Sequence, residues 1–529
     1  MSTSTDNPPP EEEDGESGNV AMALDEGKMG RAEGQYGLAR MQAIEAARYG
    51  GVLGSAGGTG QGFGYAGGDL PTAEQYADYG RNPWTEAAKD HLSTFAADVD
   101  TASYSLARRK LDEGRLPPPA AVRVEEFVNY FRYTFPAPAG NTPFSVVMDA
   151  APSPLEPART IVRVGVATRP KTVQERLPAH LVFLVDVSGS MQSPDKLPLA
   201  KRALQILTEH LSAHDTVSLV TYAGATRVVL EPTAVDPLGR AKIVAAIDSL
   251  DASGSTAMAS GIELAYARAI KSVQPGHISR VVVLSDGDAN VGPHTYDEML
   301  QIISSRAKEG VTLSTVGFGT GNYNDQLMEQ LADKGNGNNF YIDSLDQAKR
   351  VFLDDLTANL EVVAKDVKLQ VDFDPAMVAR YRLVGYENRD IKDDDFRNDK
   401  VDAGEIGAGH QVTALYEVEL TAKGKQANAP LGGIRIRHKL PAGSTAAEAA
   451  FPMVGGPAHS FAQASTDFRF AFAAAAFADV LRGGQDAEHW SLATIRDIAA
   501  RAAGTSKDRK ELVQLIDRAI ELKGRTASR

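Results

Sequence analysis

The sequence predicts the α/β fold class: a doubly wound, mostly parallel sheet with an additional β-sandwich module and C-terminal helices. Residues 181–185 are continuously apolar, as in a strand that is buried on both faces of a parallel sheet. Strand-like and helix-like segments then alternate as far as residue 360. Beyond that residue, apolar and polar side chains alternate one by one, which is typical of sandwich strands.

The composition limits the classes of protein to consider. A chain of 529 residues is too long for one ordinary domain, and 43% hydrophobic residues suffice for several cores. The net charge of -14 argues against a partner that is nucleic acid or an anionic membrane surface. The absence of cysteine excludes disulfides and thiolate metal sites. No apolar run reaches the roughly 18 residues of a membrane span, and the first residues lack a secretory signal, so we expect a soluble chain.

Residues 1–85 are predicted to be a disordered, acidic and glycine-rich tether. Three prolines and four acidic residues occupy 8–14, and glycine dominates 50–68, so little apolar surface offsets the entropy of ordering. A short helix is expected over 35–49. The letters of residues 62–67 match a dinucleotide-binding fingerprint, but no strand precedes them and no helix follows, so we reject that reading.

Residues 86–177 are predicted to form the N-terminal helices and strands of a flanking module. Helices are expected at 101–111 and 124–131, followed by strands at 144–148 and 160–167. In the second helix Glu125 and Glu126 fall opposite the apolar stripe, so we expect them to be solvated.

Residues 178–360 are predicted to form the doubly wound domain. The strand at 226–230 is expected to lie at one edge of the sheet and to run antiparallel to its neighbour. The expected strands are 181–185, 216–222, 226–230, 280–286, 312–318 and 340–342, and the expected helices are 196–211, 239–250, 258–270, 296–308, 325–332 and 345–360.

The remaining chain divides into sandwich strands over 361–445 and a helical segment over 446–529. The strands are expected at 367–373, 410–420 and 431–440, and the helices at 467–481, 489–503 and 506–522. If these strands pair with those before residue 178, the doubly wound domain is an insertion in a sandwich. Because sequential strands usually neighbour one another, two separate β modules are the alternative.

Oxygen-bearing side chains follow the first strand of the doubly wound domain. Asp186, Ser188 and Ser190 stand at alternate positions at its carboxyl end, where open α/β sheets place their ligands. Gly189 permits a tight turn, so both hydroxyls and the carboxylate can point to one place. Such oxygens suit a hard cation such as magnesium.

The pattern Asp186-x-Ser188-x-Ser190 resembles the metal-ion-dependent adhesion site (MIDAS) of von Willebrand factor type A (VWA) domains. That family also has a threonine in a later loop and an aspartate after a central strand, and Thr256 and Asp286 stand in those places. The segments 92–131 and 385–410 resemble the flanking segments of a bacterial group of VWA proteins.

The resemblance implies a bound Mg²⁺ or Mn²⁺ and a partner protein that presents an Asp or Glu. Ser188 and Ser190 would bind the cation directly, Thr256 directly or through water, and Asp186 and Asp286 in or just behind the coordination sphere. Turn or helix-capping roles for Ser188, Ser190 and Thr256 are the simpler alternatives. Related proteins are often exported, so the compartment stays open.

We expect a binding module and no catalytic residues. A metal-assisted hydrolase that uses the same cation is the alternative, but it needs a general base beside the open position, and the sequence offers no obvious one. A calcium loop starting at Asp286 is disfavoured, because Val291 stands where the turn glycine belongs. The acidic run 393–395 is expected to be solvated.

Overall fold

The computed structural model describes residue 74 and residues 76–527 apart from 98–99, 139–141, 289–295, 402, 427–428, 442 and 485. Most of the predicted tether over 1–85, with its expected helix at 35–49 and the motif at 62–67, therefore lies outside the described residues. Among the residues that are described, no helix is both long and apolar enough to cross a bilayer.

The doubly wound domain has the predicted six-stranded sheet, in the order β10-β9-β8-β5-β6-β7. All pairs are parallel except β6 with β7, so the expected antiparallel edge is confirmed. The strands are β5 (Ala179–Asp186), β6 (Thr216–Tyr222), β7 (Thr226–Ala234), β8 (Ile278–Ser285), β9 (Val311–Phe318) and β10 (Asn339–Ile342). Central strands β5 and β8 are buried almost along their whole length, which is why they read as continuous apolar runs.

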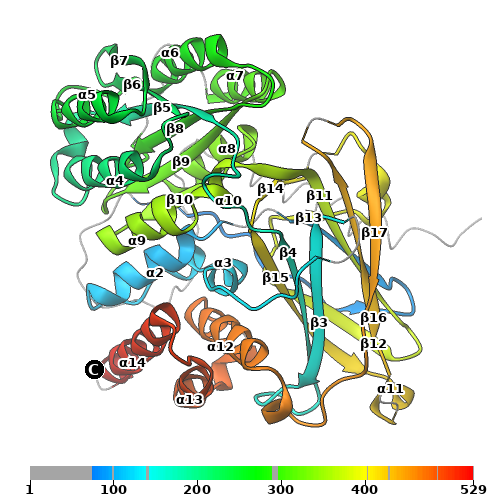
Figure 1. The fold of residues 1–529 in the computed structure, drawn as a ribbon. Coiled ribbons are helices and arrows are strands. Elements are labelled where there is room, and N and C mark those ends of the chain that lie inside the picture. Colours follow the sequence, from blue (N-terminus) through cyan, green and yellow to red (C-terminus); the bar gives the residue numbers. More distant parts are fainter. Residues whose placement is uncertain are drawn as a thin grey trace, which may run out of the picture. The chain divides into compact units, whose positions relative to one another are not determined.

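Helices cover both faces of this sheet, and each face has its own apolar core (Figure 1). One core joins α4 (Leu197–His210), α5 (Pro237–Asp248) and α9 (Leu345–Lys349) to the sheet. The other joins α6 (Met258–Ala269), α7 (Tyr296–Lys308) and α8 (Asp325–Lys334) to it. The last predicted helix is not continuous: after α9 it passes through a π-helical segment, Arg350–Asp354, and resumes as α10 (Leu356–Leu360).

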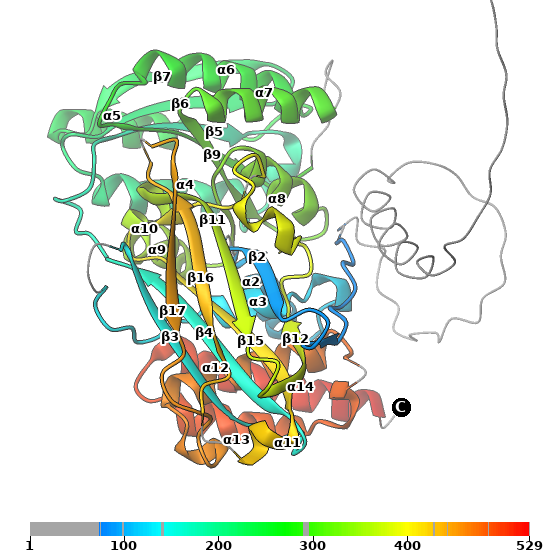
Figure 2. The ribbon, with the colours of Figure 1, turned by 90° about the vertical axis from the view of Figure 1, so that its right-hand side faces the viewer.

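Strands from both sides of the doubly wound domain pair in two antiparallel sheets, as an insertion in a sandwich requires (Figures 1 and 2). One sheet has the order β1-β12-β15-β4-β3 and the other β13-β2-β11-β16-β17, with β14 paired to β11. Their bounds are β1 (Thr85–Glu86), β2 (Leu92–Ala96), β3 (Phe144–Pro152), β4 (Thr160–Thr168), β11 (Val362–Phe373), β12 (Val378–Val384), β13 (Asp390–Ile391), β14 (Ile406–Gly407), β15 (Gln411–Leu420), β16 (Gly432–Lys439) and β17 (Ala446–Pro452).

A helical layer packs on the outer face of the sheet that contains β4 and β15. Its core joins side chains of these helices to Ile161 and Leu415 of that sheet. The helices are α2 (Ala102–Asp112), α3 (Val124–Asn129), α12 (Thr466–Leu481), α13 (Leu492–Ala502) and α14 (Lys507–Ala527), and the short α11 (Ala422–Gln426) lies after β15. The prediction of a purely helical segment from residue 446 differs from the structure at its start. Residues Ala446–Pro452, which are rich in alanine, form strand β17.

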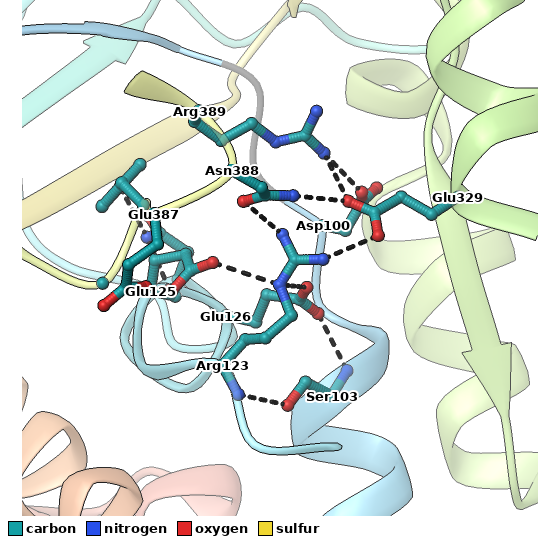
Figure 3. A network of polar contacts seen from close by, with 12 residues as sticks. Asp100, Ser103, Arg123, Glu125, Glu126, Glu329, Glu387, Asn388 and Arg389 are labelled. Atoms are coloured by element: carbon teal, nitrogen blue, oxygen red, sulfur yellow. Dashed lines mark hydrogen bonds and ion pairs between the residues drawn. The ribbon is translucent and has the colours of Figure 1, made fainter. Parts of the chain in front are cut away.

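The expectation that Glu125 and Glu126 are solvated was wrong. Each is 2% exposed, because both carboxylates surround the buried guanidinium of Arg123. Arg123 Nη1 also donates to Glu329 of α8, at 2.7 Å, so this cluster joins the flanking module to the doubly wound domain (Figure 3). Arg389 reaches the same Glu329 carboxylate at 3.2 Å. The partners of Glu125 and Glu126 are fixed by tertiary packing, which helical periodicity does not report.

The charge balance of this cluster depends on its two arginines. Burial favours the neutral acid, yet Arg123 and Arg389 outweigh it and hold the pKa of Glu329 below its ordinary value. Burial raises the pKa of Glu126 well above its ordinary value in spite of Arg123. The network therefore holds the two parts together only while each buried carboxylate keeps its cation or a proton.

Replacing Arg123 by methionine should destabilise the protein strongly. The change leaves Glu125, Glu126 and Glu329 with less compensating charge, and breaking such a buried network costs about 3–5 kcal/mol of unfolding free energy. Urea unfolding followed by circular dichroism measures the loss. Arg306→Met is the matched control, because the partly exposed Arg306 pairs with Glu309 at the surface and its loss should cost less than about 1 kcal/mol. Equal effects of the two substitutions would contradict this account.

Candidate metal site at the carboxyl edge of the sheet

Two buried aspartates end neighbouring strands of the doubly wound domain. Asp186 is the last residue of β5, and Asp286 directly follows β8, which pairs in parallel with β5. Both are 0% exposed. Because the strands are parallel and adjacent, the two carboxylates emerge at the same edge of the sheet, as predicted.

The turn after Asp186 brings the two serine hydroxyls together. Ser188 N donates to Asp186 Oδ1 at 2.9 Å, and the Oγ atoms of Ser188 and Ser190 are 3.0 Å apart. Gly189 N donates to Gly254 O at 3.0 Å, and a Cβ at position 189 would lie 3.4 Å from that carbonyl. The serine turn and the next loop are therefore in contact at Gly189.

Thr256 lies on that next loop. Ser253 N donates to Val187 O at 2.7 Å, so the loop is bonded to the serine turn on both sides of Ser188. Helix α6 begins at Met258 with Ala257 in the N-cap position and no side-chain cap. The alternative in which Thr256 caps this helix is therefore wrong, and its half-buried side chain is left for another role.

The donors to Asp186 are neutral. Besides the Ser188 amide, Ser285 Oγ donates to Asp186 Oδ2 at 3.0 Å. Burial raises the pKa of Asp186 to about 6, and the nearby Asp286 carboxylate adds to the shift. A buried carboxylate of this kind favours either a proton or a cation beside it.

Asp286 differs because Lys196 and Asn322 hold it. Its Oδ2 accepts from Lys196 Nζ at 2.8 Å and from Asn322 Nδ2 at 3.1 Å, and its Oδ1 accepts from Asp288 N at 3.1 Å. Lys196 also donates to Asn322 Oδ1 at 2.7 Å. Sequence reasoning missed both residues. Lys196 stands six residues after Ser190 and Asn322 in a glycine-rich loop after β9, and neither position carries a motif.

The residues present fit a hard cation. The residues described at this edge offer hydroxyl and carboxylate oxygens, which suit Mg²⁺ or Mn²⁺. Over the described part of the chain, no three His, Asp or Glu side chains are grouped so as to hold a metal. A site here therefore depends on serine and threonine oxygens. The acidic turn after β8 continues into residues 289–295, which lie outside the described residues, so the rest of the alternative calcium loop is not described.

Three protein families match successive stretches of this chain. Residues 180–356 match the von Willebrand factor type A domain, residues 70–163 a family described as von Willebrand factor, and residues 358–522 the family described as uncharacterized protein YfbK, C-terminal. The chain is 39% identical over 475 residues to the uncharacterized protein YfbK of Escherichia coli (strain K12), covering 84% of this chain and 81% of that protein. The chain belongs to the YfbK family of VWA domain proteins.

Other relatives share less of the chain. The uncharacterized protein sll0103 of Synechocystis is 29% identical over 191 residues, 36% of this chain and 44% of that protein. Among solved structures, a von Willebrand factor type A protein from Catenulispora acidiphila is 17% identical, covers 73% of this chain and 91% of that one, and has a TM-score of 0.43. The ArnB paralog VWA2 from Sulfolobus acidocaldarius is 15% identical, covers 72% of this chain and 98% of that one, and has a TM-score of 0.36.

The raised pKa of Asp186 predicts how pH affects the stability of this VWA protein without metal. A folded-state pKa of about 6 against an ordinary 3.8 means that the folded protein holds the proton more tightly than the unfolded chain. The resulting stabilisation is present below pH 3.8 and is lost as the pH rises through 6, by up to about 3 kcal/mol. The Asp186→Asn variant lacks this loss.

The measurement compares the unfolding free energies of wild type and Asp186→Asn in metal-free buffer at pH 4.5 and pH 7.5. The variant should gain about 2 kcal/mol relative to wild type between these two pH values, since most of the Asp186 titration lies between them. A difference that does not change with pH would show that burial does not raise the pKa of Asp186 as described above.

Proposed function

We propose that this chain is a metal-dependent protein-binding module that grips a carboxylate of a partner protein through a divalent cation. Ser188, Ser190 and Thr256 would hold Mg²⁺ or Mn²⁺ together with Asp186, and Asp286 would stand just behind. The observation that carries the proposal is the pair of converging hydroxyls, 3.0 Å apart, beside the buried Asp186 carboxylate with its neutral donors.

The ligand chemistry favours an anionic partner group. Magnesium prefers six oxygens, and three hydroxyls with one carboxylate leave positions for water or for an incoming ligand. Neutral hydroxyl oxygens cancel none of the cation's charge, so an Asp or Glu of a partner would be attracted more strongly than a neutral side chain. Binding in adhesion, envelope assembly or scaffolding would use this chemistry, and we propose binding rather than catalysis.

Calorimetric titration with Mn²⁺ tests the metal site itself. Wild type should bind one Mn²⁺, and Ser188→Ala should weaken binding at least about tenfold, because it removes one of few oxygen ligands. Ser193→Ala is the matched control: it lies on the same loop, but its hydroxyl donates to Asp195 at 2.5 Å, so the Mn²⁺ affinity should stay that of wild type. Absence of Mn²⁺ binding by wild type would overturn the proposal.

Partner binding is tested by capture with the immobilised chain in Mg²⁺ and in chelator. Wild type should retain a protein in Mg²⁺ and release it in chelator, while Asp186→Ala and Ser188→Ala should fold and retain none. Folding of both variants is checked by circular dichroism. If both captured the same proteins as wild type in chelator, binding would not depend on the cation and the proposed mode would be wrong.

A further inference from the structure

The two buried aspartates of the metal edge are compensated in different ways. Asp186 receives hydrogen bonds from a backbone amide and a serine hydroxyl, whereas Asp286 receives the ammonium group of Lys196 and the amide of Asn322 on a single oxygen. The second Asp286 oxygen accepts from a backbone amide. Asp286 thus receives three hydrogen bonds, one of them from a full positive charge, whereas the two groups that donate to Asp186 are neutral.

The position of Lys196 is fixed by its surroundings. The residue is 7% exposed and occupies the N-cap position of α4. Its aliphatic chain lies over Gly319, where an added Cβ would be 2.4 Å from the lysine Cγ and Cε atoms. Gly319 has a φ of +76°, which favours glycine, and the lack of a side chain there leaves room for the aliphatic part of Lys196. The ammonium group is therefore held at Asp286.

Lys196 changes the charge that a cation would meet. The two aspartates carry two negative charges, and Lys196 cancels one of them. A divalent cation bound at Ser188 and Ser190 would then keep a net positive charge within the site. Without the lysine, the two carboxylates would neutralise it fully, and an incoming carboxylate would gain less.

We infer that Lys196 is a positioning residue that holds Asp286 behind the coordination sphere and keeps the cation electropositive toward an anionic ligand. This inference rests on the proposed function and adds one residue to it. Lys196 would set both the affinity of the site for the metal ion and the affinity of the bound ion for a partner carboxylate. Lys196 lowers the affinity for the metal and raises the affinity of the loaded site for a carboxylate.

The test replaces Lys196 by methionine, which has a stem of similar length and no charge. Calorimetric titration should show Mn²⁺ binding about 10-fold tighter or more, as expected when one positive charge is removed from a buried cation site. Acetate binding to the Mn²⁺-loaded protein, followed by the relaxation of water protons on the ion, should be weaker by about the same factor. Lys196→Arg, which keeps the charge, should stay nearer wild type in both measurements.

A second readout separates this role from simple packing. In metal-free buffer the Lys196→Met variant has two buried carboxylates without a neighbouring positive charge, so its melting temperature should be lower than that of wild type. Saturating Mn²⁺ should raise the melting temperature of the variant more than that of wild type. Lys201→Met is the matched control on the same helix α4. Lys201 Nζ donates to the carbonyls of Asp248 and Leu250, at 2.8 and 3.0 Å, so its loss should leave Mn²⁺ affinity unchanged.

Two outcomes would overturn the inference. If Lys196→Met lowered the melting temperature equally with and without Mn²⁺ and bound Mn²⁺ like wild type, Lys196 would serve packing alone. If Mn²⁺ bound more weakly to the variant, the lysine would support the metal rather than oppose it. Failure of the proposed function is distinguishable from both, because wild type itself would then bind no Mn²⁺.

Discussion

Two carboxylates of the same charge, buried side by side at the ends of β5 and β8, are the constraint on which the site depends. Asp186 and Asp286 are both 0% exposed, so neither carboxylate faces bulk solvent. Desolvating an unpaired carboxylate costs several kcal/mol, and the sheet places two of them at one edge. Lys196 compensates one. The other has neutral donors and a raised pKa, which is the electrostatic condition that favours a bound cation.

The flanking module supports the same edge of the sheet. Arg109 of α2 donates to Asp195 at 2.5 Å, in the loop just before Lys196. Glu74 accepts from Lys110 Nζ at 2.8 Å and from Gly321 N at 2.9 Å, directly before Asn322. Both loops that bring Lys196 and Asn322 to Asp286 are therefore bonded to residues outside the VWA domain. Together with the bond from Arg123 to Glu329 on α8, these contacts tie the site to the flanking module.

Local sequence patterns predicted the sheet and the serine turn after its first strand, and the resemblance to VWA domains added Thr256 and Asp286 as candidate site residues. Buried parallel strands are continuous apolar runs, and functional side chains follow their carboxyl ends, so Asp186 and Asp286 could be placed from the sequence. The structure puts Ser188, Ser190 and the Thr256 loop beside them. Lys196 could not be recognised, because a lysine at the start of an amphipathic helix normally points to solvent. Its partner lies 90 residues away in the chain.

The other differences have the same cause. Glu125 and Glu126 were assigned to solvent by helical periodicity, but both pair with the buried Arg123, which also donates to the distant Glu329. Strand β17 was missed because its alanine-rich sequence favours a helix, and pairing with β16 decides its conformation. The π-helical segment interrupts the last predicted helix, and the spacing of apolar residues in the sequence did not indicate it. For Glu125, Glu126 and β17, tertiary contacts outweighed local preference.

The most direct test is anomalous diffraction from crystals grown with Mn²⁺. The account predicts a single strong peak in contact with the hydroxyls of Ser188 and Ser190, with Lys196 still bonded to Asp286. A map at saturating Mn²⁺ without a peak at these hydroxyls would contradict the central claim. So would a peak bound directly by Asp286 with the Lys196 ammonium displaced.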